Sequence, residues 1–240
     1  MSQQSPKDSM NLLLAALPET EYQRLIPHLR KVSLSEGQIL HESGAPAQDV
    51  YFLDEGVASL SVSSEDGKEV GLSIVGDESV VGERAIFNDG FFIIRCQMLT
   101  EGSGHKVSPE VFREEFDRGE ALHDLVLNRI EARITESAQT ALCNQVHTLE
   151  QRLSRWLLIF ADRLHSRELH ITQEHMADLL GVRRAGVTDA AGGLRDMGLI
   201  EYWRGSITII NRAGLEEKAC ECYQVIKEAI EVFTGSNAQT

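Results

Sequence analysis

The chain has 240 residues, 42% of them hydrophobic, which is enough to bury a core in one large domain or two small ones. Its net charge of -14, with a pI near 5.0, excludes general polyanion binding but leaves room for a local basic face. No apolar run approaches the length of a membrane span, and the first residues lack a basic signal region, so we expect a soluble, cytoplasmic protein.

The first predicted element is a helical segment within the first thirty residues. In LLLAALPETEYQRLIPHL, apolar residues recur at helical spacing, and Pro18 and Pro27 break the pattern. The predicted apolar side consists of Leu12, Leu13, Leu17, Tyr22, Leu25 and Leu29. We therefore expect short helical turns that bury one side.

From Lys31 the pattern changes to short apolar runs punctuated by glycine. Glycines occur at positions 37, 44, 56, 67, 76 and 82, with Val, Ile, Tyr and Phe between them. This punctuation is typical of short antiparallel strands that close into a sandwich or barrel. The dipeptide Asp66-Gly67 lies between two alternating runs and predicts a hairpin turn.

The order of these motifs resembles the jelly-roll of cyclic-nucleotide-binding domains. The resemblance is carried by the segment Gly37 to Leu40, then Gly44, VYFLDEG, DGKEVGL and GDESVVGE. It is specific in glycine spacing and not only in composition. It implies an N-terminal β-roll sensor domain, which we assign to residues 1–117.

A long helix is predicted after Gly119, because no Pro or Gly interrupts the apolar pattern there. The recurring apolar positions are Leu122, Leu125, Val126, Ile130, Ile134, Ala138, Ala141, Leu142, Val146 and Leu149. A continuous helix of about 30 residues would be about 45 Å long, and such a length usually indicates a partner helix. The alternative is a helix that packs only on the β-domain. We favour a two-fold homodimer along this helix, assigned to residues 118–148.

The C-terminal region, residues 149–240, opens with a second predicted helix, LEQRLSRWLLIFADRL. Its apolar residues Leu153, Trp156, Leu157, Phe160 and Leu164 share one face. We therefore expect an amphipathic helix with one buried side.

A helix, a glycine turn and a second helix are predicted between Thr172 and Leu194. Thr172 can cap the first helix, and Gly181 can end it. The second helix is expected to bury Val187, Ala190, Ala191 and Leu194. Helix, tight turn and helix is the arrangement in which the second helix enters the major groove of DNA.

The residues predicted to contact DNA are Thr172, Arg183, Arg184, Ala185, Thr188, Asp189, Arg195 and Arg204. An arginine can donate two hydrogen bonds to guanine, Thr188 can meet a phosphate or a thymine methyl, and Asp189 can accept from cytosine. Arg183 and Arg184 stand at the positive end of a helix dipole, so phosphate contact explains them better than a structural role does. If this arginine pair occurred without the surrounding motif, the usual interpretation would be two solvated arginines at the start of a helix.

Two alternating runs around Arg204-Gly205, in LIEYWRGSITII, predict a β-hairpin wing. The whole unit resembles the C-terminal domain of the Crp/Fnr superfamily of bacterial transcription regulators, and the β-domain with its long helix resembles their N-terminal half. This resemblance implies an α+β fold with an N-terminal antiparallel β jelly-roll (cyclic-nucleotide-binding-like), a long dimerisation helix and a C-terminal winged helix-turn-helix. It implies double-stranded DNA with a palindromic operator as partner, and RNA polymerase if the protein is an activator.

The base-reading positions depart from the family pattern in two places. Ala185 replaces the usual acidic residue, and Asp189 replaces a later arginine. We therefore expect an operator that differs from those of the family archetypes, although still a palindrome. Arg204 and Arg212 near the wing are candidate phosphate contacts, with solvated arginine as the equal alternative.

The candidate effector-binding residues are Gly82, Glu83 and Arg95. In relatives that bind cyclic AMP, a Gly-Glu pair is followed, a fixed distance later, by the arginine that holds the phosphate. Here Gly82 and Glu83 are present, but Ile93 and Ile94 stand at the arginine position and the next, and Arg95 comes two residues late. The side chains expected to close a polar pocket are Phe91, Phe92, Ile93 and Ile94. We therefore expect an effector other than cyclic AMP, or none, with a cyclic-nucleotide-responsive regulator as the alternative.

The sequence identifies no cofactor. The cysteines are Cys96, Cys143, Cys220 and Cys222. None precedes Cys96, so the N-terminal cluster that iron–sulfur sensing requires is missing. Cys220 and Cys222 lie two apart on a predicted helix and would face different directions, so packing thiols are expected and no metal site. The histidines that could bind haem are His28, His41 and His105, although a lone histidine is more often a polar surface residue.

Motifs of the common enzyme classes are missing from the sequence. GLSIVG lacks the nucleophile-elbow spacing, GSGHK lacks the length of a phosphate loop, and neither H-E-x-x-H nor G-x-G-x-x-G occurs. We therefore predict a sequence-specific DNA-binding transcription regulator and not an enzyme. A sensor module that acts through a protein partner is a further possibility, and it predicts that removal of Arg184 leaves nucleic-acid affinity unchanged.

Overall fold

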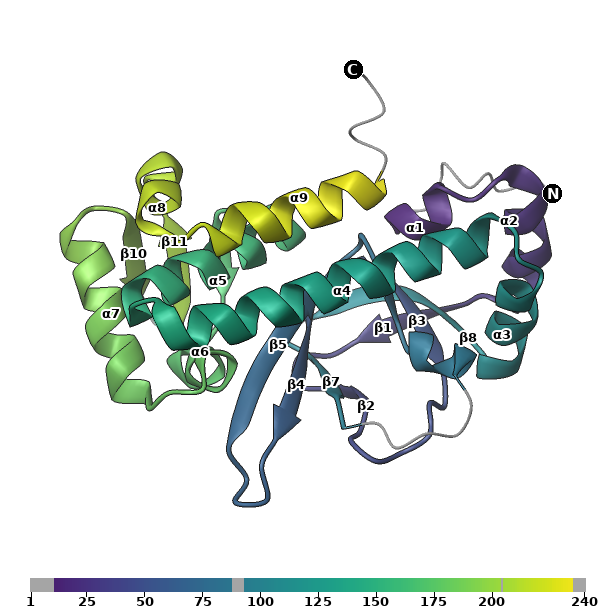
Figure 1. The fold of residues 1–240 in the computed structure, drawn as a ribbon, viewed down its shortest axis with the longest axis horizontal. Coiled ribbons are helices and arrows are strands. Elements are labelled where there is room, and N and C mark those ends of the chain that lie inside the picture. The colour runs from purple at the N-terminus through teal and green to yellow at the C-terminus, as the bar shows by residue number, and fades with distance from the viewer. Residues whose placement is uncertain (1–10, 88–92, 204, 235–240) are drawn as a thin grey trace.

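The computed structural model describes residues 11–87, 93–203 and 205–234. It has a β-rich end and a helical end, and a long helix runs from one to the other (Figure 1). The N-terminal segment forms α1 (Leu12–Ala15), α2 (Glu19–Leu25) and the 3₁₀ turn η2 (Ile26–His28). Most of its predicted apolar side is buried, but Leu12 is 41% exposed.

Two antiparallel sheets form the β-rich end, with strand orders β1-β8-β3-β6 and β2-β7-β4-β5. The bounds are β1 (Arg30–Leu34), β2 (Ile39–His41), β3 (Val50–Glu55), β4 (Ala58–Ser63), β5 (Glu69–Val75), β6 (Val80–Val81), the 3₁₀ turn η3 (Glu83–Ile86), β7 (Arg95–Met98) and β8 (Gly102–Val107). Alternating side chains such as Leu34, Leu53 and Met98 share one apolar cluster. The prediction of an antiparallel β-roll is confirmed.

The predicted hairpin at Asp66-Gly67 is confirmed and joins β4 to β5. The amide of Gly67 donates to the carbonyl oxygen of Ser64 at 2.9 Å. Gly67 has a φ of +80°, a left-handed conformation that glycine adopts without steric cost.

Helix α3 (Pro109–Asp117) leads into the long helix α4 (Ala121–Val146). With 26 residues, α4 is about 39 Å long at 1.5 Å per residue. Its first turns bury Leu122 and Val126 against the β-roll, whereas the later buried positions are mostly polar. Four large apolar side chains of α4 remain exposed in the single chain: Leu127, Ile134, Leu142 and Val146.

Helix α5 (Leu149–Leu164) lies at the centre of the helical end and begins with a capping box formed by Thr148 and Gln151. The predicted apolar residues Leu153, Trp156, Leu157 and Phe160 are buried, but burial is not confined to their face, because every residue from Leu153 to Ala161 is buried. The reason is that α5 is covered by the helices that follow it in the chain and also contacts β5.

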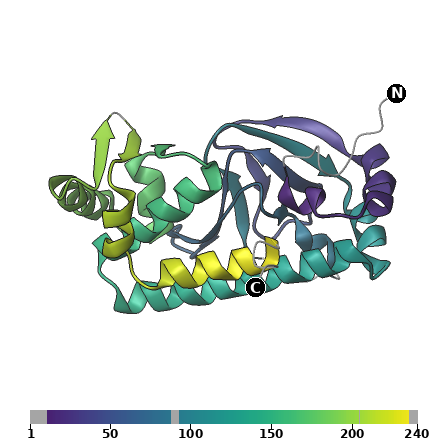
Figure 2. The ribbon, with the colours of Figure 1, turned by 90° about the horizontal axis from the view of Figure 1, so that it is seen from above.

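The winged helix-turn-helix follows α5 as predicted. Its elements are β9 (Glu168–His170), α6 (Gln173–Leu180), α7 (Arg184–Asp196), β10 (Ile200–Trp203), β11 (Ser206–Ile209) and α8 (Arg212–Lys218). The wing hairpin of β10 and β11 extends with β9 into a small antiparallel sheet. The last helix, α9 (Cys222–Thr234), folds back alongside α4, as Figures 1 and 2 both show.

The β-roll and the helix-turn-helix touch where β5 meets α6. A Cβ placed on Gly71 would lie 2.8 Å from Cδ2 of Leu179, so glycine is needed for this approach. In the part of the chain that the structure describes, no helix is both long and apolar enough to cross a bilayer.

Candidate nucleic-acid interface and effector pocket

The first helix of the helix-turn-helix is held by its two ends. The Thr172 hydroxyl accepts a hydrogen bond from the backbone N–H of His175 at 3.1 Å, so this predicted residue acts as the cap of α6. Gly181 ends the helix with a φ of +62°. These two residues therefore fix where α6 begins and ends.

Helix α7 has the two faces that its sequence predicts. The residues Val187, Ala190, Ala191 and Leu194 are buried in the core of the helical end. The predicted DNA-contacting residues of α7 and its cap are exposed: Arg183, Arg184, Ala185, Thr188, Asp189 and Arg195. The structure therefore brings these six positions to one exposed helix and its start.

The polar side chains on α7 differ in whether they have a hydrogen-bond or ion-pair partner within the protein. The Thr188 hydroxyl lies 2.9 Å from Oε1 of Gln173, and Arg195 pairs with Asp196 at 3.0 Å. Within the described residues, neither Arg183 nor Arg184 forms an ion pair. Since both stand at the positive end of the α7 dipole, they are the cations on this helix most in need of an outside anion.

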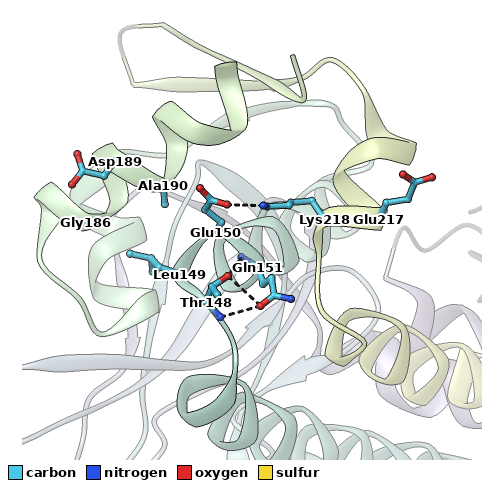
Figure 3. A pocket seen from close by; sticks show the side chains of 9 residues that line it. All are labelled: Thr148, Leu149, Glu150, Gln151, Gly186, Asp189, Ala190, Glu217 and Lys218. Atoms are coloured by element: carbon cyan, nitrogen blue, oxygen red, sulfur yellow. Dashed lines mark hydrogen bonds and ion pairs between the residues drawn. The ribbon is translucent and has the colours of Figure 1, made fainter. Parts of the chain in front are cut away.

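An open groove lies between the start of α5, α7 and α8 (Figure 3). Across it, Nζ of Lys218 lies 2.6 Å from Oε2 of Glu150, whereas the Asp189 carboxylate is directed away from this pair. A Cβ on Gly193 would lie 2.6 Å from Oε1 of Glu150, the end of a flexible side chain, so an added methyl group would have to displace this carboxylate. Gly192 has no such neighbour within 4 Å, and nothing in the structure explains it.

The wing residue Arg204 lies outside the described residues, so its predicted contact has no structural counterpart here. Arg212, the other candidate phosphate contact near the wing, is engaged within the protein, and its side chain is 30% exposed. Its guanidinium lies 2.6 Å from Oδ1 of Asp162 and 2.7 Å from the Tyr223 hydroxyl. Arg212 therefore ties α8 to α5 and α9.

Gly82 and Glu83 line a cavity of about 20 Å³ in the β-roll, where about one water molecule fits. Gly82 has a φ of +96°, and a Cβ there would lie 2.7 Å from Nε2 of His41. Burial lowers the pKa of His41, so the neutral imidazole fills the space beside the glycine. Ile94 closes the cavity on another side.

The structure does not bring Arg95 to this cavity, which corrects its expected place beside Gly82 and Glu83. Its guanidinium lies 3.3 Å from Glu69 and 3.5 Å from Glu42 on the other face of the sheet. The reason is strand alternation, because Cys96, the next residue of β7, is the one that lines the cavity.

Of the residues 91–94 predicted to close the pocket, the structure describes Ile93 and Ile94, and Ile94 lines the cavity. Ile93 is 52% exposed and does not line the cavity. Phe91 and Phe92 lie outside the described residues.

Sequence reasoning missed the cation that faces Glu83, which is Arg133 of α4. Arg133 also donates to Oγ of Ser79 at 3.1 Å and to the carbonyl oxygen of Val80 at 3.2 Å. Burial lowers the pKa of Arg133 to about 10, so the guanidinium stays charged at neutral pH. No local signal could have found it, because it lies fifty residues beyond Glu83 in the sequence.

A second buried ion network joins the β-roll, α4 and α5. Nε of Arg163 on α5 lies 3.0 Å from Oε1 of Glu78, and the same guanidinium contacts Glu136 of α4. Glu136 also accepts a hydrogen bond from Ser73 of β5. Burial opposes the charge of Arg163, but the two carboxylates outweigh it and raise its pKa. A displacement of any one of these elements disturbs the other two.

Two family models match consecutive parts of the chain. Residues 31–118 match the cyclic nucleotide-binding domain, and residues 151–218 match the Crp-like helix-turn-helix domain. The first match contains Gly82 and Glu83, and the second contains the whole of α7.

Curated relatives cover most of the chain. A CRP-like cAMP-activated global transcriptional regulator of Mycobacterium tuberculosis is 26% identical over 204 residues, which are 81% of this chain and 90% of that protein. A global nitrogen regulator of Synechococcus elongatus is 23% identical and covers 76% of this chain and 86% of its own length.

Solved structures share the fold at lower identity. A CRP/FNR-family transcriptional regulator from Thermus thermophilus has a TM-score of 0.64 and 21% identity, with 79% of this chain and 98% of that chain covered. A c-di-GMP responsive global regulator from Xanthomonas campestris has a TM-score of 0.66 and 17% identity, covering 80% and 99%.

Proposed function

The chain belongs to the Crp/Fnr superfamily of DNA-binding transcription regulators, and from this premise we propose that it is a homodimer that reads a palindromic operator through α7. The observation that supports it most is the exposed start of α7. There Arg183 and Arg184 lack an ion pair within the described residues. A DNA phosphate or a guanine edge would supply their missing partner.

The contacts divide between positioning and base reading. Arg184, Ala185, Thr188 and Asp189 face the bases, and Arg195 contacts a phosphate at the far end of α7. Thr172 contributes by capping α6, which orients this helix against the DNA backbone. Arg204, which lies in the sequence between the two strands of the wing, adds a phosphate contact that is proposed from the sequence alone. Where the protein activates transcription, RNA polymerase is its further partner.

Dimerisation is proposed along α4, and the exposed apolar residues of this helix support it. Leu127, Ile134, Ala138 and Ala141 recur at steps of seven, four and three, which places them on one side of α4. The alanines allow a close approach of a second helix. In this division of the chain, residues 1–117 form the sensor domain, 118–148 the dimerisation helix and 149–240 the DNA-binding domain.

The effector is proposed to be a small molecule other than cyclic AMP. The cavity at Gly82 and Glu83 is far smaller than a nucleotide, and Arg95 is engaged elsewhere. Glu83 is already paired with Arg133 of α4, so an effector that enters here has to compete for that pair. Through Arg133 and the network of Arg163, a change in the β-roll reaches α4 and α5, and from there the DNA-binding domain.

The experiment that tests this function is selection of bound fragments from genomic DNA by the purified full-length protein, with and without cyclic AMP. Arg184→Ala is the test variant. Arg118→Ala is the control, because Arg118 is also an exposed arginine but lies directly after α3, outside the helix-turn-helix. One palindrome recovered by the wild type and the control, but not by Arg184→Ala, is the expected result.

The other outcomes separate the alternatives. Enrichment only with cyclic AMP would show that the nucleotide does enter the β-roll and would overturn the effector proposal. No enriched sequence in either arm would favour a module that acts through a protein partner.

A further inference from the structure

Four potential metal ligands meet at the joint between α4, α5 and α9. Cys143 lies in the last turn of α4, His147 lies between α4 and α5, Cys220 precedes α9 and Cys222 begins it. One ligand atom from each side chain lies within 4.8 Å of those of the other three. These four side chains are called the thiol–imidazole cluster below.

The expectation that Cys220 and Cys222 face different directions was wrong. It assumed that both residues lie on one helix, but α8 ends at Lys218 and α9 begins only at Cys222. The connection turns between them, so both thiols face Cys143 on α4. Figure 2 shows how α9 runs back beside α4 and brings these distant segments together.

The spacing of the cluster suits a tetrahedral ion. Sγ of Cys143 lies 3.4 Å from Sγ of Cys220, and Sγ of Cys222 lies 3.7 Å from Nδ1 of His147. Two thiolates on one zinc ion at about 2.3 Å are about 3.8 Å apart, and a thiolate and an imidazole nitrogen are slightly closer. Small side-chain adjustments therefore produce the coordination geometry without moving the helices.

A carboxylate orients the imidazole of the cluster. Nε2 of His147 lies 3.2 Å from Oε2 of Glu221. A hydrogen bond donated by Nε2–H to this carboxylate fixes the tautomer in which Nδ1 carries the lone pair and faces Cys222. A carboxylate behind a histidine ligand is the usual outer-shell partner in zinc sites.

Beside the cluster lies a buried positive charge without a carboxylate. Arg155 of α5 has no exposed surface, and in the described residues it forms no ion pair. Its Nη1 donates to Thr140, one turn before Cys143, while Nε and Nη2 have no hydrogen-bond partner. A buried guanidinium without a counter-charge is costly. Three thiolates and one dication carry a net charge of about -1, which would balance Arg155.

We propose that the thiol–imidazole cluster binds one zinc ion in a closed, tetrahedral site. Sulfur and imidazole nitrogen are the ligands that Zn²⁺ prefers, and four protein ligands leave no open position for catalysis. The zinc ion is therefore structural, and it binds as the thiols release their protons. All four ligands lie outside the helix-turn-helix match, which covers residues 151–218.

The zinc ion joins α9 to the connection between α4 and α5. Only His147 and Thr148 separate these two helices, so the ion holds the segment that sets the angle between them. Zinc binding thus stabilises the placement of the DNA-binding domain relative to α4. That last consequence rests on the proposed function, whereas the metal site does not.

The site is tested with the reduced full-length protein, purified from zinc-supplemented cells. Zinc content is measured by elemental analysis, and the stripped protein is titrated with Co²⁺, whose thiolate charge-transfer and tetrahedral d–d absorption report the ligands. The variants are Cys143→Ser, Cys220→Ser, Cys222→Ser and His147→Gln. Matched controls are Cys96→Ser, a buried cysteine in β7, and His170→Gln, an exposed histidine in β9.

The expected result is one zinc ion per chain in the wild type and both controls, with a tetrahedral cobalt spectrum. Each cysteine variant of the cluster should lose the metal, and His147→Gln should bind it more weakly. If the reduced wild-type protein gives no cobalt–thiolate absorption, the proposal is overturned. A Cys143–Cys220 disulfide formed in air would not rescue it, because the titration uses reduced protein. The wild-type titration does not depend on whether a variant folds.

Operator binding by metal-loaded and chelator-stripped protein then separates the two proposals. Weaker binding after stripping, restored by zinc, is expected. If the protein binds zinc but no operator, the proposed function is contradicted and the zinc site stands. If it binds an operator but takes up no zinc, the zinc site is contradicted and the proposed function stands.

Discussion

The start of α7 and the cavity at Gly82 differ in whether the protein itself supplies ion-pair partners for their charged side chains. Arg183 and Arg184 stand in solvent without an ion pair among the described residues, so their strongest partner has to come from outside. In the cavity, Glu83 and Arg133 are largely buried and satisfy each other. The start of α7 can therefore bind a polyanion, whereas the charges in the Gly82 cavity already neutralise each other. A ligand can act on the cavity only by disturbing a pair that stabilises the fold.

Breaking the enclosed pair should have the largest effect. Arg133→Met leaves the Glu83 carboxylate buried without its cation, which we expect to lower the free energy of unfolding by about 3 kcal/mol. Arg184→Met, the same substitution on the exposed helix, should change it by less than about 0.5 kcal/mol. Urea denaturation of both variants checks this, and equal stabilities would mean that the Glu83–Arg133 pair contributes nothing to the fold.

The exposed region should respond in DNA affinity instead of stability. Arg184→Met removes a charged hydrogen-bond donor to DNA, so operator affinity should fall by about 1–3 kcal/mol, roughly 5- to 150-fold. A fluorescence titration with the selected operator at fixed salt measures it. An affinity within twofold of the wild type would remove Arg184 from the reading surface.

Gly192 and Gly193 of α7 offer a smaller test of which side of the helix is packed. Gly192→Ala should raise the free energy of unfolding by up to about 1 kcal/mol, because helix propensity improves and no atom is close. Gly193→Ala should lose most of that gain, since its Cβ would displace the Glu150 carboxylate that pairs with Lys218. Thermal unfolding of both variants compares them, and equal gains would show that α5 does not restrict α7 at Gly193.

The smallest expected effect is a pH dependence at the cavity. Burial places the pKa of folded His41 below its ordinary value of 6.5, so the unfolded chain takes up this proton first. The stability contributed by neutral His41 is present above pH 6.5 and is lost as the pH falls through the folded pKa. His41→Leu should flatten this part of the stability profile, whereas His170→Gln should not. A profile that His41→Leu leaves unchanged would contradict the assignment.

Much of the helical end was predictable because its signals are local. The burial of Val187, Ala190 and Leu194 follows from helical spacing, and the turn at Gly181 follows from the freedom of glycine. The same reasoning failed for α5. Its Ser154 and Arg155 are polar in sequence but buried in the fold, because neighbours cover every side of the helix.

Sequence by itself determined most of the elements, their order and the exposed face of α7, because periodicity and turn chemistry act over a few residues. The α+β architecture followed from the family resemblance. Only the tertiary structure decided what meets across the chain. It placed Arg133 against Glu83, turned Arg95 away from them, and gathered Cys143 and Cys220 where α9 folds back on α4. These pairings depend on strand alternation and on the path of the backbone between distant elements, which no local pattern records.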